Sequence, residues 1–304
     1  MSELLQLAQK ILERRDGNEQ IEVFVSSSTE NDVRAYQGEI EDLTTASSDG
    51  VGIRVLTDSS SGARVGSAWA GSLDESAIAE ALREARDNVR FATEDEFVAF
   101  AQPDGVVAPQ LTLTSPDVES VSLDEKVALA IELERAVRAS DSRIRQVDAA
   151  SYSDYSASGA IASTTGIRAT YARTMAYLSV EAIATDGVED QSGWGLSAGR
   201  GPRDIDLDRA RRDAVLRCTR MLGAVKPSTR KGTAVFDARA TATLLSIIGG
   251  ALSGEAVSGR VATRPARKEN IAAGRTAHHN FAACGVEATF GGRFSANKCF
   301  RKSP

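Results

Sequence analysis

Apolar residues spaced three and four apart predict a helix over residues 3–15. Its apolar face carries Leu4, Leu5, Ala8, Ile11 and Leu12. Two more helices are predicted to begin at Ser72 and Ser122, because both positions open the sequence Ser-Leu-Asp-Glu. A serine followed three residues later by glutamate has capping-box spacing, in which each side chain bonds the other residue's backbone N–H. A charged helix is predicted over residues 204–222.

Alternation of apolar and polar residues predicts antiparallel strands in both halves of the chain. The predicted segments are residues 21–27, 32–50, 51–58, 63–71, 144–164, 166–187 and 188–199. Turns are expected at Asp49-Gly50 and at residues 59–62, where glycine and serine gather. Helices combined with antiparallel strands indicate the α+β class.

A strand followed directly by a helix is predicted within residues 227–258. Residues 233–236 form a short apolar run, and Asp237 stands where an N-cap residue opens a helix. The apolar stripe of this helix comprises Leu244, Ile247, Ile248, Ala251 and Leu252. The adjacent Gly249 and Gly250 each cost about 1 kcal/mol in a helix. We expect either close approach to another backbone or local flexibility at this pair.

These elements predict three domains. An N-terminal α/β domain with an antiparallel sheet covers residues 1–100, and a proline-containing linker covers residues 101–121. A middle β-rich domain with flanking helices covers residues 122–226. The strand and helix of residues 227–259 begin a C-terminal domain, followed by an atypical basic tail over residues 260–304. Because an amphipathic helix needs another layer to cover its stripe, this third domain is expected to be incomplete or to be completed by a partner.

Charge separates the tail from the rest of the chain. The net charge is −6, but residues 260–304 hold nine Lys or Arg and two acidic residues, leaving 27 of the 36 basic and 40 of the 42 acidic residues in the first 259. Nucleic-acid binding needs clustered Lys and Arg, so an acidic body argues against it. Apolar runs fall far short of the roughly 20 residues of a membrane span, and no signal peptide is recognisable. We expect a cytoplasmic protein without a membrane partner.

The cysteines and histidines offer only a weak metal site. Cys218 lies on the apolar face of a predicted helix and is interpreted as a buried residue. His278, His279, Cys284 and Cys299 all lie in the tail, and their spacing matches no common zinc template. A disordered tail is favoured over a metal cluster.

Two separated stretches resemble a known family. Residues 49–82, DGVGIRVLTD…ARVGSAWAGSLDESAIAEAL, look like the N-terminal domain of the TldD/PmbA family, also called modulators of DNA gyrase. Residues 232–257, GTAVFDARATATLLSIIGGALSGEAV, are similar to the start of the C-terminal domain in the PmbA (TldE) branch. The resemblance covers roughly residues 1–259 and ends at Arg260. The abrupt change of composition there leads to the hypothesis of a truncated or frameshifted C-terminal region.

The resemblance implies a subunit of a heteromeric zinc-dependent peptidase that processes unfolded or leader-bearing peptides. In the TldD branch the C-terminal helix carries an HExxxH motif, whose histidines bind zinc and whose glutamate acts as the base, and the PmbA branch lacks this motif. Here Leu244, Leu245 and Gly249 occupy the corresponding positions, and no histidine precedes His278. This chain is expected to hold no catalytic residue, metal or cofactor, and a TldD-like paralogue to supply the zinc. The alternative is a non-enzymatic binding protein, a degenerate member of the family.

Other candidate sites are weaker. Trp69 and Trp194 each lie in a Gly/Ser-rich strand, where they either line a peptide-binding wall or enter a core. The carboxylates Glu39 and Glu41 are better explained as solvated strand residues than as a general acid–base pair.

Overall fold

The computed structural model describes residues 2–107, 109, 111–229 and 231–252 of the 304-residue chain. By its internal contacts the chain divides into two compact units, Met1–Lys226 and Pro227–Pro304. Within the described residues the fold is mixed α+β, which confirms the predicted class. Among the helices of this part of the chain, none has both the length and the apolar character needed to cross a bilayer.

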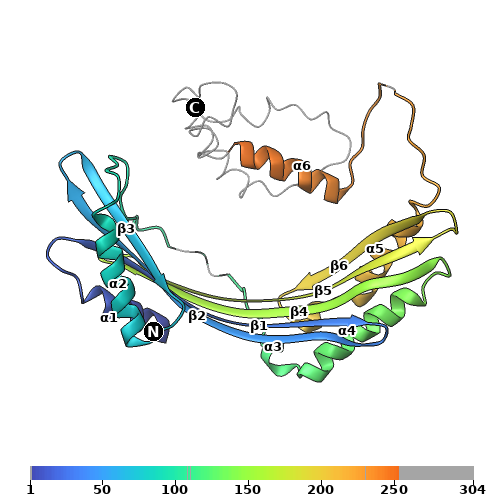
Figure 1. Cartoon of the computed structure of the whole chain (residues 1–304), viewed down its shortest axis with the longest axis horizontal. Coiled ribbons are helices and arrows are strands. Elements are labelled where there is room, and N and C mark those ends of the chain that lie inside the picture. The colour runs from blue at the N-terminus through green and yellow to red at the C-terminus, as the bar shows by residue number, and fades with distance from the viewer. Residues whose placement is uncertain (1, 108, 110, 230, 253–304) are drawn as a thin grey trace. The chain divides into compact units, whose positions relative to one another are not determined.

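One antiparallel six-stranded sheet runs through the first unit (Figure 1). Its strands are β1 (Gln20–Tyr36), β2 (Glu39–Ser59), β3 (Gly62–Ala70), β4 (Ile144–Ser163), β5 (Arg168–Thr185) and β6 (Asp190–Gly199). Their order across the sheet is β3-β2-β1-β4-β5-β6, and β1 pairs with β4 from Glu22 to Ala35. This pairing joins the N-terminal and middle segments of the chain into a single sheet, whose long strands curve along their length (Figure 1).

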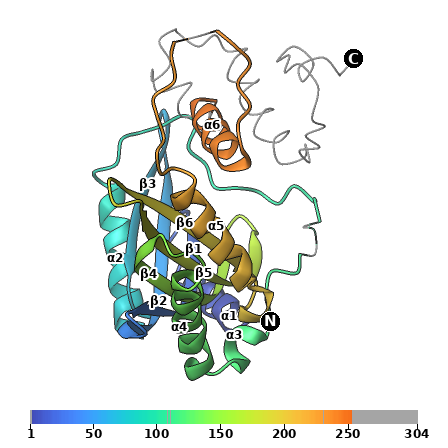
Figure 2. The ribbon, with the colours of Figure 1, turned by 90° about the vertical axis from the view of Figure 1, so that its right-hand side faces the viewer.

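Helices cover one face of the sheet near both of its ends (Figures 1 and 2). They are α1 (Glu3–Leu12), α2 (Glu75–Val89), α3 (Asp117–Ser120), α4 (Leu123–Arg138) and α5 (Leu207–Thr219), with a short 3₁₀ turn at Pro202–Asp204. One core lies between α1, α2 and the sheet and includes Ile21 and Val23, and the other lies under α4 and α5 and includes Val33 and Ala35. All four residues are odd-numbered members of β1, so both cores lie on the same face of the sheet. Cys218 is fully buried in the second core, as predicted.

The two Ser-Leu-Asp-Glu sequences give different helix starts. Ser122 is the N-cap of α4, and it forms a complete capping box with Glu125. The expectation of a box at Ser72 is wrong, because α2 begins after Asp74 and the Ser72 hydroxyl accepts a hydrogen bond from the Asp74 N–H at 3.0 Å. The same four residues therefore form a capping box only where the serine itself is the N-cap residue.

The first hairpin turns at a different place from the one predicted. β2 continues through Gly50, which pairs with Ser26, and the turn lies at Gln37 and Gly38, with φ of 56° and 83°. Their N–H groups each donate to a carboxylate oxygen of Glu134 on α4, at 2.8 Å. The carboxylate binds a left-handed turn from 96 residues along the chain, a contact that local sequence does not encode.

Glycines on the two edge strands allow the backbones of the neighbouring helices to approach closely. A Cβ atom placed on Gly66 of β3 would lie 2.1 Å from the carbonyl oxygen of Ala85 in α2. On β6, a Cβ on Gly195 would lie 1.8 Å from the carbonyl oxygen of Ala210 in α5. Only glycine permits these approaches, so each edge strand and its helix pack backbone to backbone.

In the second unit, the described residues contain the helix α6 (Ala238–Ala251). Asp237 is its N-cap, as predicted, and accepts a hydrogen bond from the Ala240 N–H at 2.8 Å. The predicted strand over residues 233–236 is wrong, because these residues are exposed and pair with no described strand. A Cβ on Gly249 or Gly250 would meet no atom within 4 Å outside the helix, so close approach to another backbone of the described chain does not explain the glycine pair.

Candidate functional site

The face of the sheet away from the helices carries a row of aromatic and small residues. Strand register places Trp69 of β3, Gly52 of β2, Phe24 of β1 and Ile161 of β4 side by side. Phe24 stacks on Tyr171 of β5, with 6.5 Å between ring centroids and 16° between ring planes. A Cβ atom on Gly52 would meet nothing within 4 Å, so open space separates the Trp69 and Phe24 positions. This aromatic row is suited to contact with apolar groups of a peptide.

The two predicted tryptophan sites lie at opposite edges of the sheet. Trp69 is 79% exposed on β3, and Trp194 is 36% exposed on β6, where it lies opposite Glu181 of β5. Five inter-strand steps of about 4.8 Å separate the two strands by roughly 24 Å across the sheet. Trp69 is therefore a surface residue, and the structure does not bring the two tryptophans into one site.

Two strand segments have a free edge within the described structure. Residues 39–50 of β2 pair only with β1, because the ladder to β3 begins at Val51. The second segment is the start of β5, because the ladder between β5 and β6 begins at Ala176. This segment is free only in part, since the Thr174 N–H donates to the carbonyl oxygen of Leu113. An unpaired edge presents N–H and C=O groups that can accept an added strand.

A buried ion pair connects α4 to the centre of the sheet. Lys126 Nζ lies 2.7 Å from Asp154 Oδ2, and the two side chains are 5% and 0% exposed. Tyr152 donates its hydroxyl to the same carboxylate at 2.6 Å, and Asn31 donates its amide at 2.9 Å. Burial and the hydrogen bond to Asp154 raise the pKa of Tyr152. Lys126 also donates to the carbonyl oxygen of Val118 at 2.8 Å, so these side chains satisfy one another and form a structural network.

The sequence holds a signal for this network that periodicity alone did not pick out. Lys126 shares the buried stripe of α4 with Ala130, Leu133 and Val137. A charged residue at a stripe position indicates a buried partner.

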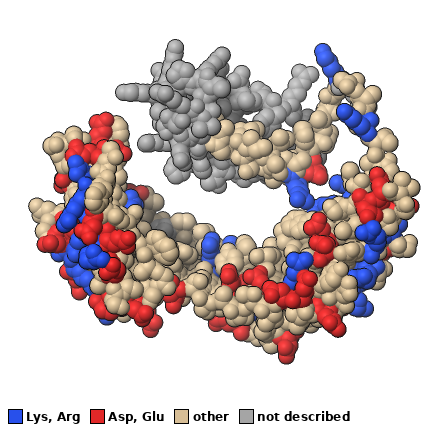
Figure 3. Space-filling model, in the orientation of Figure 1, with Lys and Arg blue, Asp and Glu red and all other residues tan. Residues whose placement is uncertain are grey.

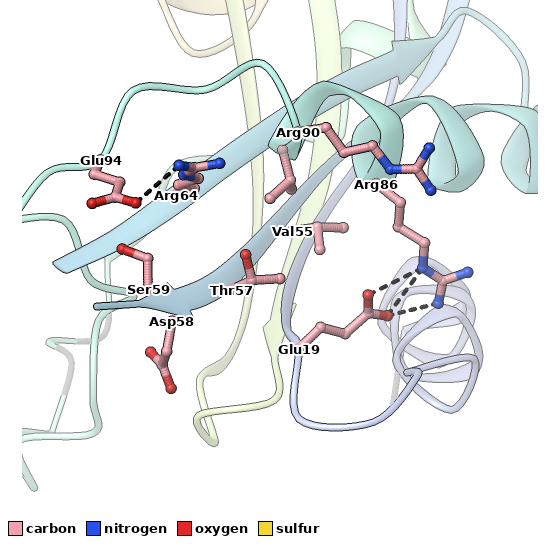
Figure 4. Close-up of a pocket in the computed structure, with 10 residues that line it drawn as sticks. Glu19, Val55, Thr57, Asp58, Ser59, Arg64, Arg86, Arg90 and Glu94 are labelled. Carbon is pink, nitrogen blue, oxygen red and sulfur yellow. Dashed lines mark hydrogen bonds and ion pairs between the residues drawn. The ribbon is translucent and has the colours of Figure 1, made fainter. Parts of the chain in front are cut away.

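A cleft of about 480 Å³ lies at the end of β2 beside the C-terminal turn of α2 (Figure 4). Arg86 bonds Glu19, with Nη2 2.6 Å from Oε1, and Arg64 bonds Glu94 at 2.9 Å. Hydrogen bonds from Ser61 and Arg64 lower the pKa of Glu94. The lining residues include three arginines and three carboxylates and neither histidine nor cysteine. The lining residues thus carry equal numbers of positive and negative charges, and they include neither a histidine base nor a cysteine nucleophile.

The residues expected from the resemblance at the family's zinc positions do not fit a metal ion. Leu244 and Leu245 have hydrocarbon side chains and Gly249 has none, so α6 offers no ligand atom at these positions. Across the described residues, no three His, Cys, Asp or Glu side chains gather closely enough to hold a metal. The tail candidates, from His278 to Cys299, and the hypothesis of a frameshift after residue 259 lie outside the described residues.

Comparison with known proteins identifies the family. The PmbA/TldA metallopeptidase domain 1 matches residues 21–89, and the PmbA/TldA metallopeptidase central domain matches residues 116–222. Together the two matches cover more than half of the 304 residues and follow the family's domain order. The chain belongs to the PmbA/TldD family. Both matched segments lie in the first unit, and the β1–β4 pairing joins them into its sheet.

Individual members of the PmbA/TldD family agree with this assignment. The chain is 28% identical over 239 residues to the metalloprotease PmbA of Escherichia coli O157:H7, covering 78% of this chain and 52% of that protein. A putative modulator of DNA gyrase from Bacteroides thetaiotaomicron has a similar structure, with a TM-score of 0.73 and 23% identity over 86% of this chain and 59% of the other. TldE from Thermococcus kodakarensis gives a TM-score of 0.58 and 18% identity, covering 70% and 45%. This chain thus spans about half the length of the curated relative.

Proposed function

We propose that this chain is a PmbA/TldE-like subunit of a heteromeric zinc-dependent peptidase, and that it holds no zinc itself. One observation carries the proposal: no histidine precedes His278, and α6, the helix that by resemblance corresponds to the HExxxH helix of the TldD branch, carries Leu244, Leu245 and Gly249 at the expected motif positions. The zinc then belongs to a TldD-like paralogue, which supplies the metal-bound water and the general base. Unfolded or leader-bearing peptides are the expected substrates, and the cytoplasm is the expected location.

The apolar stripe of α6 supports a role in assembly. Leu244, Ile247 and Ile248 are 42%, 65% and 49% exposed in the described structure. A stripe of this size in water favours burial against another apolar surface. In the proposed assembly, α6 packs against the partner or against further chain and contributes shape and contact area, and no ligand.

Co-expression with a TldD-like paralogue tests the proposal. We expect the two chains to co-elute in size-exclusion chromatography and to cleave fluorescein-labelled casein, which has little folded structure. A paralogue whose metal-binding histidines are replaced by alanine should co-elute with this chain and fail to cleave. Casein cleavage by this chain alone, with stoichiometric zinc, would contradict the proposal. Complex formation without any cleavage would favour the alternative, a non-enzymatic binding protein.

A matched pair of substitutions tests the assembly role of α6. Ile247→Asp places a charge on the apolar stripe and is expected to abolish co-elution. Ser246→Asp adds the same charge on the opposite side of the helix and should leave co-elution unchanged. Equal behaviour of the two variants would show that the stripe does not contact the paralogue.

A further inference from the structure

Residues 39–50 of β2 form a long free strand edge. They pair with β1 on one side and with no described strand on the other. All of them are exposed except Ala46 and Gly50, which are partly exposed. In an antiparallel pair, alternate residues direct their N–H and C=O groups away from the partner strand. This edge therefore presents a row of main-chain donors and acceptors to an approaching strand.

The same edge is acidic. It carries Glu39, Glu41, Asp42 and Asp49 and no Lys or Arg. Glu41 lies in an irregularity of the β1–β2 register and is paired with Arg34, whose Nε is 2.5 Å from Glu41 Oε2. None of the other three carboxylates has a basic partner in the described structure. Figure 3 shows acidic side chains among those on the face of the first unit that is turned to the viewer.

We propose that residues 39–50 bind an extended, Lys- and Arg-rich peptide segment by adding it to the sheet as a further strand. Main-chain hydrogen bonds would hold the segment, and the carboxylates would select basic side chains. A second copy of this chain is a poor occupant, because both edges would be negatively charged and neither would supply a Lys or Arg to the other. The inference deepens the proposed function, on which it rests for peptides as ligands, by naming the class of peptide.

Register sets where the basic side chains are needed. Glu39 and Asp42 lie opposite Tyr36 and Arg34 of β1, on the face away from the helices, whereas Asp49 lies opposite Ser27 on the other face. Successive side chains of an added strand alternate between the two faces. Near one end of a bound segment, two of its side chains, two positions apart and on one face, therefore meet Glu39 and Asp42. Near the other end, a side chain on the opposite face meets Asp49.

Peptide binding to the full chain, without paralogue or zinc, tests this proposal. The probe is a fluorescein-labelled peptide of about twelve residues that repeats Lys-Lys-Thr, so that it spans the edge and places lysines on both faces of the added strand. The edge variant combines Glu39→Gln, Asp42→Asn and Asp49→Asn. The matched control combines Glu13→Gln, Glu84→Gln and Glu96→Gln, which change the net charge equally at exposed positions away from the edge.

Loss of three exposed ion pairs predicts a rise in Kd of roughly 3- to 100-fold for the edge variant, whereas the control variant should stay within about 2-fold. Bound peptide should slow hydrogen exchange of the backbone amides in residues 39–50. A peptide N-methylated at every residue should lose binding, because it cannot donate main-chain hydrogen bonds from either edge. Equal weakening of both variants, or full affinity of the N-methylated peptide, would reduce the effect to net charge and overturn the proposal.

Two other occupants have their own signatures, and each would overturn the proposal. Amide protection in residues 39–50 that grows with protein concentration and needs no peptide would assign the edge to a second copy of this chain. Protection without peptide that does not depend on concentration but is lost in high salt would assign it to basic residues of the same chain. Failure of peptide binding beside an active complex with a paralogue would leave the proposed function intact. Peptide binding to residues 39–50 without peptidase activity in that complex would support this proposal and contradict the proposed function.

Discussion

Replacing Lys126 with methionine is expected to destabilise the first unit by about 3–5 kcal/mol, the typical effect of removing one partner of a buried ion pair. Methionine keeps most of the aliphatic stem but removes the ammonium group that lies 2.7 Å from Asp154. The carboxylate, 0% exposed, would then keep only the hydrogen bonds from Tyr152 and Asn31. The carbonyl oxygen of Val118 would lose its donor as well.

Thermal and urea denaturation measure this effect. For a unit of this size, a loss of 3–5 kcal/mol lowers Tm by about 6–20 °C. Lys10→Met is the matched control, because Lys10 is an exposed residue of α1, and a surface change of this kind stays within about 0.5 kcal/mol. Asp154→Asn should lower the free energy of unfolding less in the Lys126→Met chain than in the wild type, because the double variant leaves no buried charge unpaired. The coupling energy between the two substitutions should be at least about 1 kcal/mol. If Lys126→Met is no more destabilising than Lys10→Met, the reasoning from the buried pair is refuted.

Three other predictions test how local geometry stabilises the fold. Gly195→Ala forces a Cβ to within 1.8 Å of a backbone oxygen of α5 and should cost about 3 kcal/mol by urea denaturation, whereas Gly52→Ala, with nothing within 4 Å, should be tolerated, and equal costs would contradict the packing account. Ser122→Ala removes a complete capping box and should cost about 1 kcal/mol, whereas Ser72→Ala, which removes no helix cap, should cost less than half of that in the same assay. Asp141 has a pKa lowered to about 2 by hydrogen bonds from the arginine two residues on. Because this value lies below the unfolded pKa of about 3.9, its stabilising contribution is complete above about pH 4 and disappears as the pH falls through 2. Asp141→Asn should remove that part of the acid sensitivity between about pH 4 and pH 2, and an unchanged pH profile of the urea midpoint would contradict this assignment.

Local pattern was sufficient to predict most of the elements. The three- and four-residue spacing of apolar positions predicts α1 and α6, and the caps at Ser122 and Asp237 are confirmed. These signals are local because helix hydrogen bonds and caps join residues three or four apart. The exposure of the α6 stripe also follows from the sequence, since no neighbouring element was predicted to cover it.

Features that depend on distant residues could not be predicted. Glu134 binds the turn at Gln37 and Gly38 from a helix in the next segment of the chain, and a turn signal at Asp49-Gly50 was stronger locally. The strand predicted over residues 233–236 has suitable residues but no partner strand among the described residues, and a strand without a ladder leaves its backbone groups unpaired. The continuity of the sheet across β1 and β4 is likewise a long-range pairing that period-two patterns do not specify.

The candidate site was predictable only in part. Resemblance placed Leu244, Leu245 and Gly249 on a helix, and α6 is that helix, but their role in an assembly stays a prediction. The aromatic row through Trp69 and Phe24 depends on register across three strands, so the sequence could mark Trp69 without showing its neighbours. The free acidic edge of β2 depends on the ladder to β3 beginning at Val51, a long-range pairing that no local pattern specifies.

Zinc analysis tests the central claim most directly. The full chain is purified alone and together with a TldD-like paralogue, and zinc is measured per chain by elemental analysis after exhaustive dialysis. The account predicts no bound zinc in the chain alone and zinc equal to the amount of paralogue in the complex, lost when the paralogue's metal-binding histidines are replaced by alanine. Stoichiometric zinc in this chain alone, or zinc in the complex that survives those replacements, would contradict it.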